Sequence, residues 1–158
     1  MKHVQIYTDG SCLGNPGKGG YGAVLIFGEY RKEISGGYVL TTNNRMELMA
    51  CIKALEALKY PCGVTITSDS KYVVDGISKG WAKKWKKNNW KRSNKSQAEN
   101  IDLWEKLLNL SGQHVTNFVW VKGHDGHNEN ERCDELAKEA AENEKLEEDT
   151  GYKKHNIS

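Results

Sequence analysis

Four acidic residues of this 158-residue chain stand where their carboxylates could meet in one site. Asp9 follows one predicted strand, and Asp69 ends another. Glu47 and Asp134 each fall near the start of a predicted helix. Because active sites of open sheets gather beyond the ends of strands, these side chains are candidates for a shared site.

Carboxylates that are brought together repel one another, and a cation is needed to neutralise them. A set of ligands made only of oxygen atoms favours Mg²⁺ or Mn²⁺ over zinc. Two such ions about 3.5–4 Å apart could activate a water and stabilise the leaving oxygen of a phosphodiester. The four acids therefore predict metal-dependent phosphodiester chemistry, provided that they converge in space.

Each acid taken alone also has an ordinary structural explanation. An aspartate at the end of a strand often only begins a turn, which would account for Asp9 and Asp69. Asn44 and Glu47 have the spacing of a capping box, in which Glu47 would reach back to the amide of Asn44. A carboxylate near a helix start, such as Asp134, complements the helix dipole. These alternatives remain open at the level of single residues.

A glycine-rich loop is predicted over residues 121–128 and carries two histidines, His124 and His127. A histidine on such a loop could relay protons near neutral pH, because its unperturbed pKa is about 6.5. The alternative is an exposed turn histidine. A zinc site made of His124, His127 and Cys133 is disfavoured, since a fourth ligand and the usual paired spacing are missing.

The elements that must position these residues follow from hydrophobic periodicity. Three neighbouring strands with short connections predict an antiparallel meander, and alternating helices and strands follow it. The pattern predicts an α/β fold with a five-stranded mixed sheet and helices on its faces. The expected strands are 4–8, 21–27, 32–40, 64–69 and 115–121; the expected helices are 44–59, 72–77, 103–110 and 130–144; and residues 10–20 are expected to be a turn-rich loop.

Charge is unevenly distributed, although the formal net charge is only +2. Residues 80–96 hold seven basic residues and three tryptophans without one acid, and residues 131–149 carry a net charge of −6. The basic segment has two interpretations. Its tryptophans Trp81 and Trp85 could pack on the core as one helix face, or its lysines could bind a polyanion with aromatic rings stacking on sugars or bases. Both can hold together.

Length and composition exclude several classes. Apolar residues make up 37% of the chain, and no run approaches the ~20 residues that a membrane span needs. The first residues turn polar at once, unlike a secretory signal, and four widely spaced cysteines are expected to be reduced thiols. We expect one domain over residues 1–158, with a basic protrusion near 80–96, a flexible tail near 145–158, a cytoplasmic location and no membrane association.

Five stretches of the chain resemble bacterial ribonuclease H of type 1, in the order of that family. They are residues 7–17 (YTDGSCLGNPG), 41–48 (TTNNRMEL), 67–70 (TSDS), 120–124 (WVKGH) and 129–134 (ENERCD). The resemblance runs from about residue 3 to 142, and residues 149–152 (DTGY) are also similar. It implies a ribonuclease H-like fold, with a three-strand meander and two parallel strands, and cleavage of the RNA strand of RNA–DNA hybrids to 3′-hydroxyl and 5′-phosphate ends.

The resemblance also implies the roles of the site residues. Asp9 would bridge two Mg²⁺ ions, for which Mn²⁺ could substitute. Glu47 and Asp69 would hold the first ion, and Asp134 the second. His124 would assist proton transfer or product departure.

Contacts to an RNA–DNA hybrid are implied in the same way. Residues along the RNA strand would be Gly10, Ser11, Cys12, Asn15 and Asn44; residues at a DNA phosphate would be Thr42 and Asn43; and the basic protrusion would contribute Trp81, Lys84, Trp85, Lys86, Lys87, Trp90 and Lys91. Lys71 stands where several relatives have the glutamine of a minor-groove contact. The protein is expected to act as a monomer.

Two rival functions are weighed against this one. A DNA-cutting integrase or transposase of the same superfamily usually carries extra binding domains, for which 158 residues leave little room. A hybrid-binding module that has lost its chemistry is disfavoured, because all four acids and His124 are present.

Overall fold

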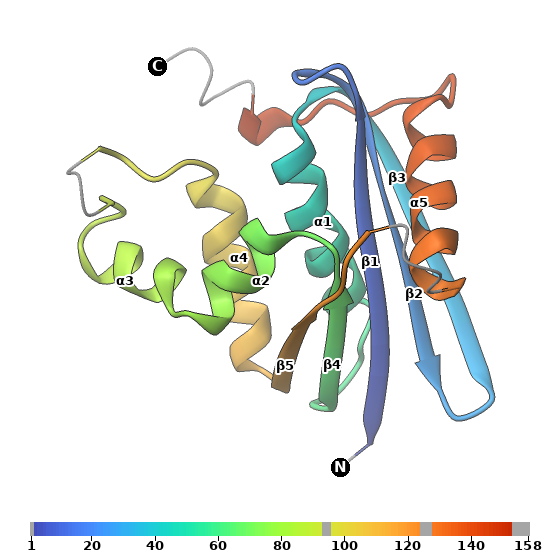
Figure 1. Cartoon of the computed structure of the whole chain (residues 1–158), viewed down its shortest axis with the longest axis horizontal. Coiled ribbons are helices and arrows are strands. Elements are labelled where there is room, and N and C mark those ends of the chain that lie inside the picture. Colours follow the sequence, from blue (N-terminus) through green and yellow to red (C-terminus); the bar gives the residue numbers. More distant parts are fainter. Residues whose placement is uncertain (1, 93–95, 124–127, 153–158) are drawn as a thin grey trace.

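A computed structural model describes residues 2–92, 96–123 and 128–152, and its centre is one mixed sheet (Figure 1). The strands of the described residues are β1 (His3–Leu13), β2 (Gly17–Phe27), β3 (Tyr30–Thr41), β4 (Gly63–Ser68) and β5 (Val115–Trp120). They are arranged in the order β3-β2-β1-β4-β5. The pairs β1–β2 and β2–β3 are antiparallel, whereas β1–β4 and β4–β5 are parallel. The predicted mixed sheet is confirmed.

The first hairpin is longer than the sequence predicts. β1 continues to Leu13, which pairs with Lys18, and only residues 14–16 form the turn. The prediction of a loop over residues 10–20 is therefore wrong. Its glycines suggested turns, but within a strand a glycine also marks a place where another part of the chain approaches closely.

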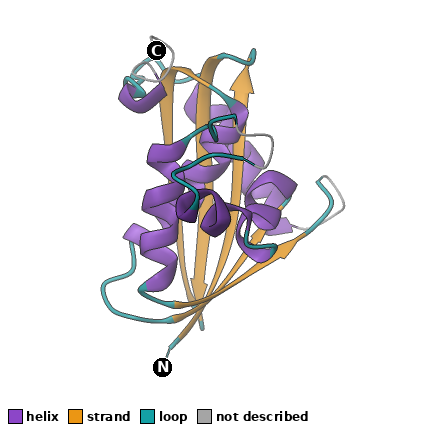
Figure 2. Ribbon diagram, turned by 90° about the vertical axis from the view of Figure 1, so that its left-hand side faces the viewer, coloured by secondary structure: helices purple, strands orange, loops and turns teal. Residues whose placement is uncertain are grey.

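Helices cover both faces of the sheet (Figure 2). They are α1 (Asn43–Glu56), α2 (Lys71–Ser78), α3 (Trp81–Lys87), α4 (Ile101–Gly112) and α5 (Asn128–Ala141). Buried residues of α1, α2 and α4 share one core with β1 and β4, and α5 packs on the opposite face against Val24. None of the helices in the described part of the chain has the length and apolar character that a bilayer span requires.

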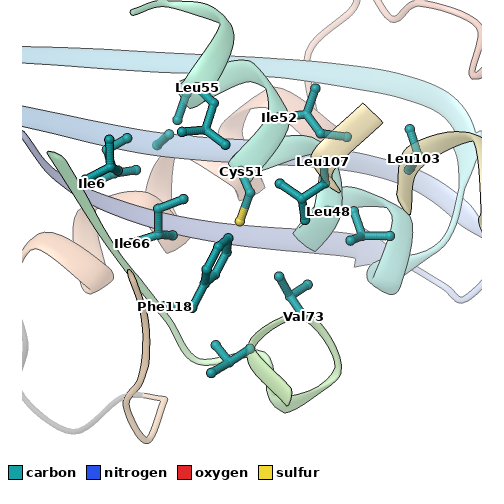
Figure 3. Close-up of a cluster of buried hydrophobic side chains, with 14 of the residues drawn as sticks. Ile6, Leu48, Cys51, Ile52, Leu55, Ile66, Val73, Leu103, Leu107 and Phe118 are labelled. Carbon is teal, nitrogen blue, oxygen red and sulfur yellow. The ribbon is translucent and has the colours of Figure 1, made fainter. Parts of the chain in front are cut away.

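The main core holds α1 against the sheet (Figure 3). Leu48, Cys51, Ile52 and Leu55 form an apolar stripe along α1, and all four are buried. Burying each large aliphatic side chain stabilises the fold by about 1.5–3 kcal/mol relative to its exposed form. The stripe therefore fixes the rotation of α1, and with it the direction of the polar residues in the first turns of the helix.

The acidic segment after α5 is packed against the sheet as far as the structure describes it. The Val39 amide donates to the Glu147 carbonyl at 2.8 Å, and the Glu147 amide donates to the Gly37 carbonyl at 3.0 Å. Asp149 is buried and accepts a hydrogen bond from Arg45 at 2.8 Å. Residues 147–149 are thus tied to β3 and to α1, the predicted flexibility of the tail stays a prediction, and residues 153–158 lie outside the described residues.

Candidate active site

The four predicted carboxylates come from four different elements and line one cavity. Asp9 lies within β1, Glu47 lies on α1, Asp69 follows β4, and Asp134 lies on α5. The cavity has a volume of about 270 Å³, and Gly10, Asn43 and Ser70 complete its lining. Parallel pairing of Thr8 with Ser68 places the next residues of the two strands, Asp9 and Asp69, at the same edge.

Glycine in β1 allows α1 to reach Asp9. A Cβ atom on Gly10 would lie only 2.6 Å from the backbone nitrogen of Glu47, so no larger residue fits there. The Gly10 amide donates to Asp9 Oδ1 at 2.9 Å and to Glu47 Oε1 at 2.6 Å. This amide is thus engaged with both carboxylates, and it orients them toward the cavity.

The capping-box interpretation of Glu47 is wrong. The N-cap of α1 is Thr42, whose hydroxyl accepts from the Arg45 amide at 3.3 Å. Arg45 therefore occupies the N3 position that a capping-box glutamate would need, and Glu47 lies two residues beyond it. Its carboxylate faces the Asp9 strand instead.

Glycine in β2 allows α5 to reach the same place from the other face. Gly22 pairs with Asp9 across the hairpin, and a Cβ atom there would lie 2.5 Å from the Cys133 carbonyl oxygen. Cys133 itself is buried and its thiol donates to the Tyr7 carbonyl at 3.2 Å. The close approach of α5 brings the next residue, Asp134, to the cavity.

The zinc alternative receives no support from Cys133. Burial raises the pKa of its thiol above the usual range, whereas a zinc ligand must be a thiolate. His124 and His127 lie outside the described residues, so the placement of the predicted loop histidine stays a prediction.

Asp9, Glu47 and Asp69 form the closest group of carboxylates. Each offers an oxygen, and these three atoms all lie within 4.8 Å of one another. Burial, together with the charges of Asp69 and Asp134, raises the pKa of Asp9 to about 7. Burial and the neighbouring charge of Asp9 raise the pKa of Glu47 well above its ordinary value. The group is therefore destabilised when all its members are ionised and no cation is bound.

One oxygen of this group is buried without a donor. Among the described residues, no N–H or O–H group donates to Glu47 Oε2. An unsatisfied buried carboxylate oxygen is costly unless an ion or another ligand completes it. The all-oxygen donor set and this orphan atom together fit a hard divalent cation such as Mg²⁺ or Mn²⁺.

Asp134 differs from the other three acids. It lines the cavity but stands outside the group of three, and its Oδ2 forms an ion pair with Lys138 at 3.0 Å. The pair is spaced i, i+4 on α5, so both side chains are held on one face of the helix.

The predicted RNA-strand and phosphate residues lie beside the cavity on the first hairpin and the start of α1. Asn15 accepts through Oδ1 from the Asn43 amide at 3.2 Å, which ties the tip of the hairpin to the helix. The Cys12 thiol donates to the Thr41 carbonyl at 3.5 Å. Other members of the predicted set here are half-buried: Ser11, Thr42 and Asn44.

The basic segment combines the two interpretations of its sequence. Its predicted phosphate-binding residues are all exposed: Lys84, Lys86, Lys87 and Lys91. Trp85 packs with its ring edge-on, 5.9 Å from the buried Trp104 ring, and anchors α3 to the core. Trp81 is 41% exposed, and Trp90 donates through its indole to Glu105 at 3.2 Å.

One residue near the cavity is absent from the predictions. Trp120, at the end of β5, donates its indole N–H to the Asp69 carbonyl at 3.1 Å. The ammonium of Lys71 lies over the Trp120 ring, 4.7 Å from the ring centroid. The sequence offers two signals for Trp120: it lies near the end of the last predicted strand, and it opens the stretch 120–124 that resembles the ribonuclease H family.

Comparison with known proteins gives a consistent result. The family model described as RNase H matches residues 1–142. A protein named Ribonuclease H from Syntrophus aciditrophicus is 62% identical over 152 residues, which cover 96% of this chain and 88% of the relative. Another of that name from Rippkaea orientalis is 60% identical over 156 residues, which cover 99% and 96%.

Solved structures agree with these relatives. LC9-RNase H1, a type 1 RNase H with the type 2 active-site motif, superposes with a TM-score of 0.79 at 34% identity, covering 89% of this chain and 72% of that one. LC11-RNase H1 in complex with an RNA/DNA hybrid gives a TM-score of 0.64 at 26% identity, covering 87% and 96%.

Proposed function

This chain belongs to the ribonuclease H family, and we propose that it hydrolyses the RNA strand of RNA–DNA hybrids to 3′-hydroxyl and 5′-phosphate ends. The observation that carries the proposal is the convergence of Asp9, Glu47, Asp69 and Asp134 on one cavity. A relative of known structure, LC11-RNase H1, binds an RNA/DNA hybrid, which supports the choice of substrate.

The metal cofactor is proposed to be Mg²⁺, with two ions per site and Mn²⁺ as a substitute. Asp9 would bridge the two ions, Glu47 and Asp69 would hold the first, and Asp134 the second. Bound divalent ions lower the pKa of water and neutralise the charge that grows on a phosphodiester during in-line attack. The orphan Oε2 of Glu47 and the raised pKa of Asp9 support a site that is completed by cations.

The chain itself contributes orientation and charge. The Gly10 amide holds Asp9 and Glu47 in fixed directions, so the ligands need little rearrangement before the reaction. His124 is proposed to assist proton transfer or product departure, as a histidine near neutral pKa can. His124 comes directly after Gly123 in the sequence, and Gly123 lies against the Asp69 carboxylate.

Selection of the hybrid is assigned to the surface beside the cavity. The RNA strand shows its 2′-hydroxyls in a wide minor groove, where backbone groups and amide side chains can read them. Gly10, Ser11, Cys12, Asn15 and Asn44 are proposed to follow this strand. Thr42 and Asn43 are proposed to hold a DNA phosphate, and the exposed lysines of the basic segment to follow the DNA backbone.

The protein is further proposed to act as a monomer in the cytoplasm. All four carboxylates come from one chain, so the site needs no second copy. The four cysteines are unpaired thiols, as is usual in a reducing compartment. Light scattering of the purified protein and cell fractionation test these two points.

The decisive experiment compares three substrates: an RNA–DNA hybrid, double-stranded RNA and double-stranded DNA. Each is incubated with the protein in Mg²⁺ and in EDTA, and the ends of the products are determined. We expect cleavage of the hybrid alone, only with Mg²⁺, and with 5′-phosphate ends. Cleavage of double-stranded DNA would favour the integrase-like alternative, and binding of the hybrid without cleavage would favour a binding module.

A further inference from the structure

Trp120, the last residue of β5, contacts two residues near the carboxylate cavity, Asp69 and Lys71. We propose that Trp120 is a positioning residue: its indole N–H fixes Asp69, and its ring holds the Lys71 ammonium beside the cavity to contact a backbone phosphate of the hybrid. This inference rests on the proposed function and adds to it a residue that acts through two others.

Asp69 needs such support because it stands just beyond its strand. Ser68 is the last residue of β4 and pairs with Trp120, and the Val121 amide still donates to the Ser68 carbonyl at 3.0 Å. One residue further, the carbonyl of Asp69 accepts from the indole of Trp120 at 3.1 Å. The indole of Trp120 thus makes the next hydrogen bond along this segment, to the residue directly after β4, beyond the backbone hydrogen bond of Ser68.

The carboxylate of Asp69 is restrained by the same segment. A Cβ atom on Gly123 would lie 2.8 Å from Asp69 Oδ2, so the backbone after β5 lies directly against this oxygen. Asp69 is therefore held at its carbonyl by Trp120 and bounded at its carboxylate by Gly123. A displacement of about 1 Å in a catalytic group can cost on the order of 100-fold in rate, which makes this restraint consequential.

Lys71 lies over the face of the same indole ring. It lies in the first turn of α2, directly after Ser70, which caps this helix and lines the cavity. Its ammonium lies over the Trp120 ring at 4.7 Å, and within the described residues it has no ion-pair partner. By contrast, the ammonium of Lys138 is paired with Asp134, which lines the cavity. Lys71 is thus held in place with its three N–H donors available.

The chemistry of this ammonium favours phosphate over a base edge. A lysine is a compact charge with rotatable donors, suited to a phosphate oxygen, whereas a minor-groove base edge is read by amides such as the glutamine that Lys71 replaces. Through these two contacts, Trp120 would both position the metal ligand Asp69 and hold Lys71 where it binds one phosphate of the hybrid.

Three variants separate the two contacts. Trp120→Phe keeps an aromatic ring for Lys71 but removes the N–H; Lys71→Met removes only the charge; Trp120→Ala removes both. Lys2→Met is the matched control, because the Lys2 ammonium also lies over an aromatic ring, that of Phe27 at 5.1 Å, at the opposite end of β1. Mg²⁺ affinity is measured by calorimetry without nucleic acid, and hybrid affinity in EDTA over a series of salt concentrations.

We expect Trp120→Phe to weaken Mg²⁺ binding by about two- to tenfold, the value of one hydrogen bond, with an unchanged salt slope for the hybrid. Lys71→Met should reduce that slope by about one unit without weakening Mg²⁺ binding. Trp120→Ala should show both effects, and Lys2→Met neither. In the wild type, the Trp120 indole cross-peak in a ¹⁵N–¹H spectrum, assigned by its absence from Trp120→Phe, should move when Mg²⁺ is added.

An unmoved cross-peak together with unchanged Mg²⁺ affinity in Trp120→Phe would overturn the contact to Asp69. An unchanged salt slope in Lys71→Met would overturn the contact to phosphate. If Trp120→Phe does not fold, the cross-peak is assigned in the wild type by triple-resonance experiments, so the first question is still answered. Failure of the proposed function appears differently, as a wild-type protein that binds Mg²⁺ and hybrid but does not cleave.

Discussion

Helix α1 contributes to two buried ionic clusters that differ in charge: one pairs a cation with carboxylates, and the other contains carboxylates alone. Arg45 lies in one and Glu47, two residues later, in the other. Arg45 is 1% exposed and lies between Asp149 and Asp102, to which it donates at 2.8 and 2.7 Å. Glu47 is 3% exposed and lies among carboxylates of its own sign, with one oxygen lacking a donor.

The arginine cluster is satisfied by its own groups. Thr41 donates its hydroxyl to Asp149 Oδ2 at 2.7 Å, and the guanidinium contacts both oxygens of Asp149. Burial opposes the charge of Arg45, but hydrogen bonds to Asp102 and Asp149 raise its pKa overall. This cluster joins the start of α1 to α4 and to the segment after α5.

The difference shows how to distinguish structural from functional charge in one fold. A buried ion set with both signs, whose hydrogen bonds are made within the chain, needs no ligand to complete it. A buried set of one sign with raised pKa values and an orphan oxygen costs stability, which is expected where function needs the arrangement. The first cluster can offset part of the cost of the second, because both act on the same turns of α1.

Among the variants of the two clusters, Asp9→Asn should lose the most activity. This change removes the proposed bridging ligand, so hybrid cleavage in Mg²⁺ should fall by about 10³-fold or more. Single-turnover rates on a labelled hybrid measure it. Asp75→Asn, which removes an acid that forms an ion pair with Lys79 on α2, is the control and should keep wild-type rates. A variant that retains wild-type cleavage without Asp9 would refute the assignment of this cluster.

Arg45→Met tests the other cluster. It leaves Asp149 buried without its cation, and breaking a buried pair in this way costs about 3–5 kcal/mol. Urea unfolding measures the loss, and the metal affinity of the folded fraction should change far less than in Asp9→Asn. A loss below about 1 kcal/mol would show that the arginine cluster is not the stabilising one.

Stability should also depend on pH through Asp9. The pKa of the Asp9 carboxyl rises from about 3.9 in the unfolded chain to about 7 in the fold. The folded state therefore holds the proton more tightly, and this contribution to stability is complete below about pH 4 and is lost as the pH rises through about 7.

Urea unfolding in EDTA at pH 4 and pH 8 checks this dependence. Between pH 4 and pH 8 the free energy of unfolding should decrease in both proteins. The decrease should be smaller in Asp9→Asn than in the wild type, with a difference on the order of a few kcal/mol. Mg²⁺ should restore stability at pH 8 in the wild type only. Parallel curves for the two proteins would contradict the raised pKa.

The sequence predicts one cluster and misses the other for a physical reason. Asp9, Glu47, Asp69 and Asp134 follow predicted strands or begin predicted helices, so topology and family resemblance suffice to bring them together. The contact between Arg45 and Asp149 spans 104 positions. Both residues lie in stretches that resemble the family, but no local pattern indicates that they form a pair.

Local patterns also fail where one residue has two plausible partners. Asn44 and Glu47 have the spacing of a cap, but Thr42 begins the helix and releases Glu47 for the cavity. Likewise Gly10 resembles a turn residue, whereas the absence of a side chain at Gly10 and Gly22 lets two helices approach Asp9 closely. Such outcomes depend on tertiary packing that hydrophobic periodicity does not contain.

Asp102→Asn should change stability only slightly, and it tests whether burial sets the strength of the contacts in the arginine cluster. Asp102 and Asp149 accept from the same guanidinium at similar distances, but the Asp102 side chain is 34% exposed and that of Asp149 only 4%. Water can replace part of the interaction at Asp102, so its loss should cost about 0.5–1 kcal/mol and less at high salt. Asp149→Asn should cost clearly more and depend little on salt, because its surroundings exclude water. Urea unfolding of both variants at low and high salt makes the measurement, and equal losses would mean that contact geometry, not burial, sets the strength of the arginine cluster.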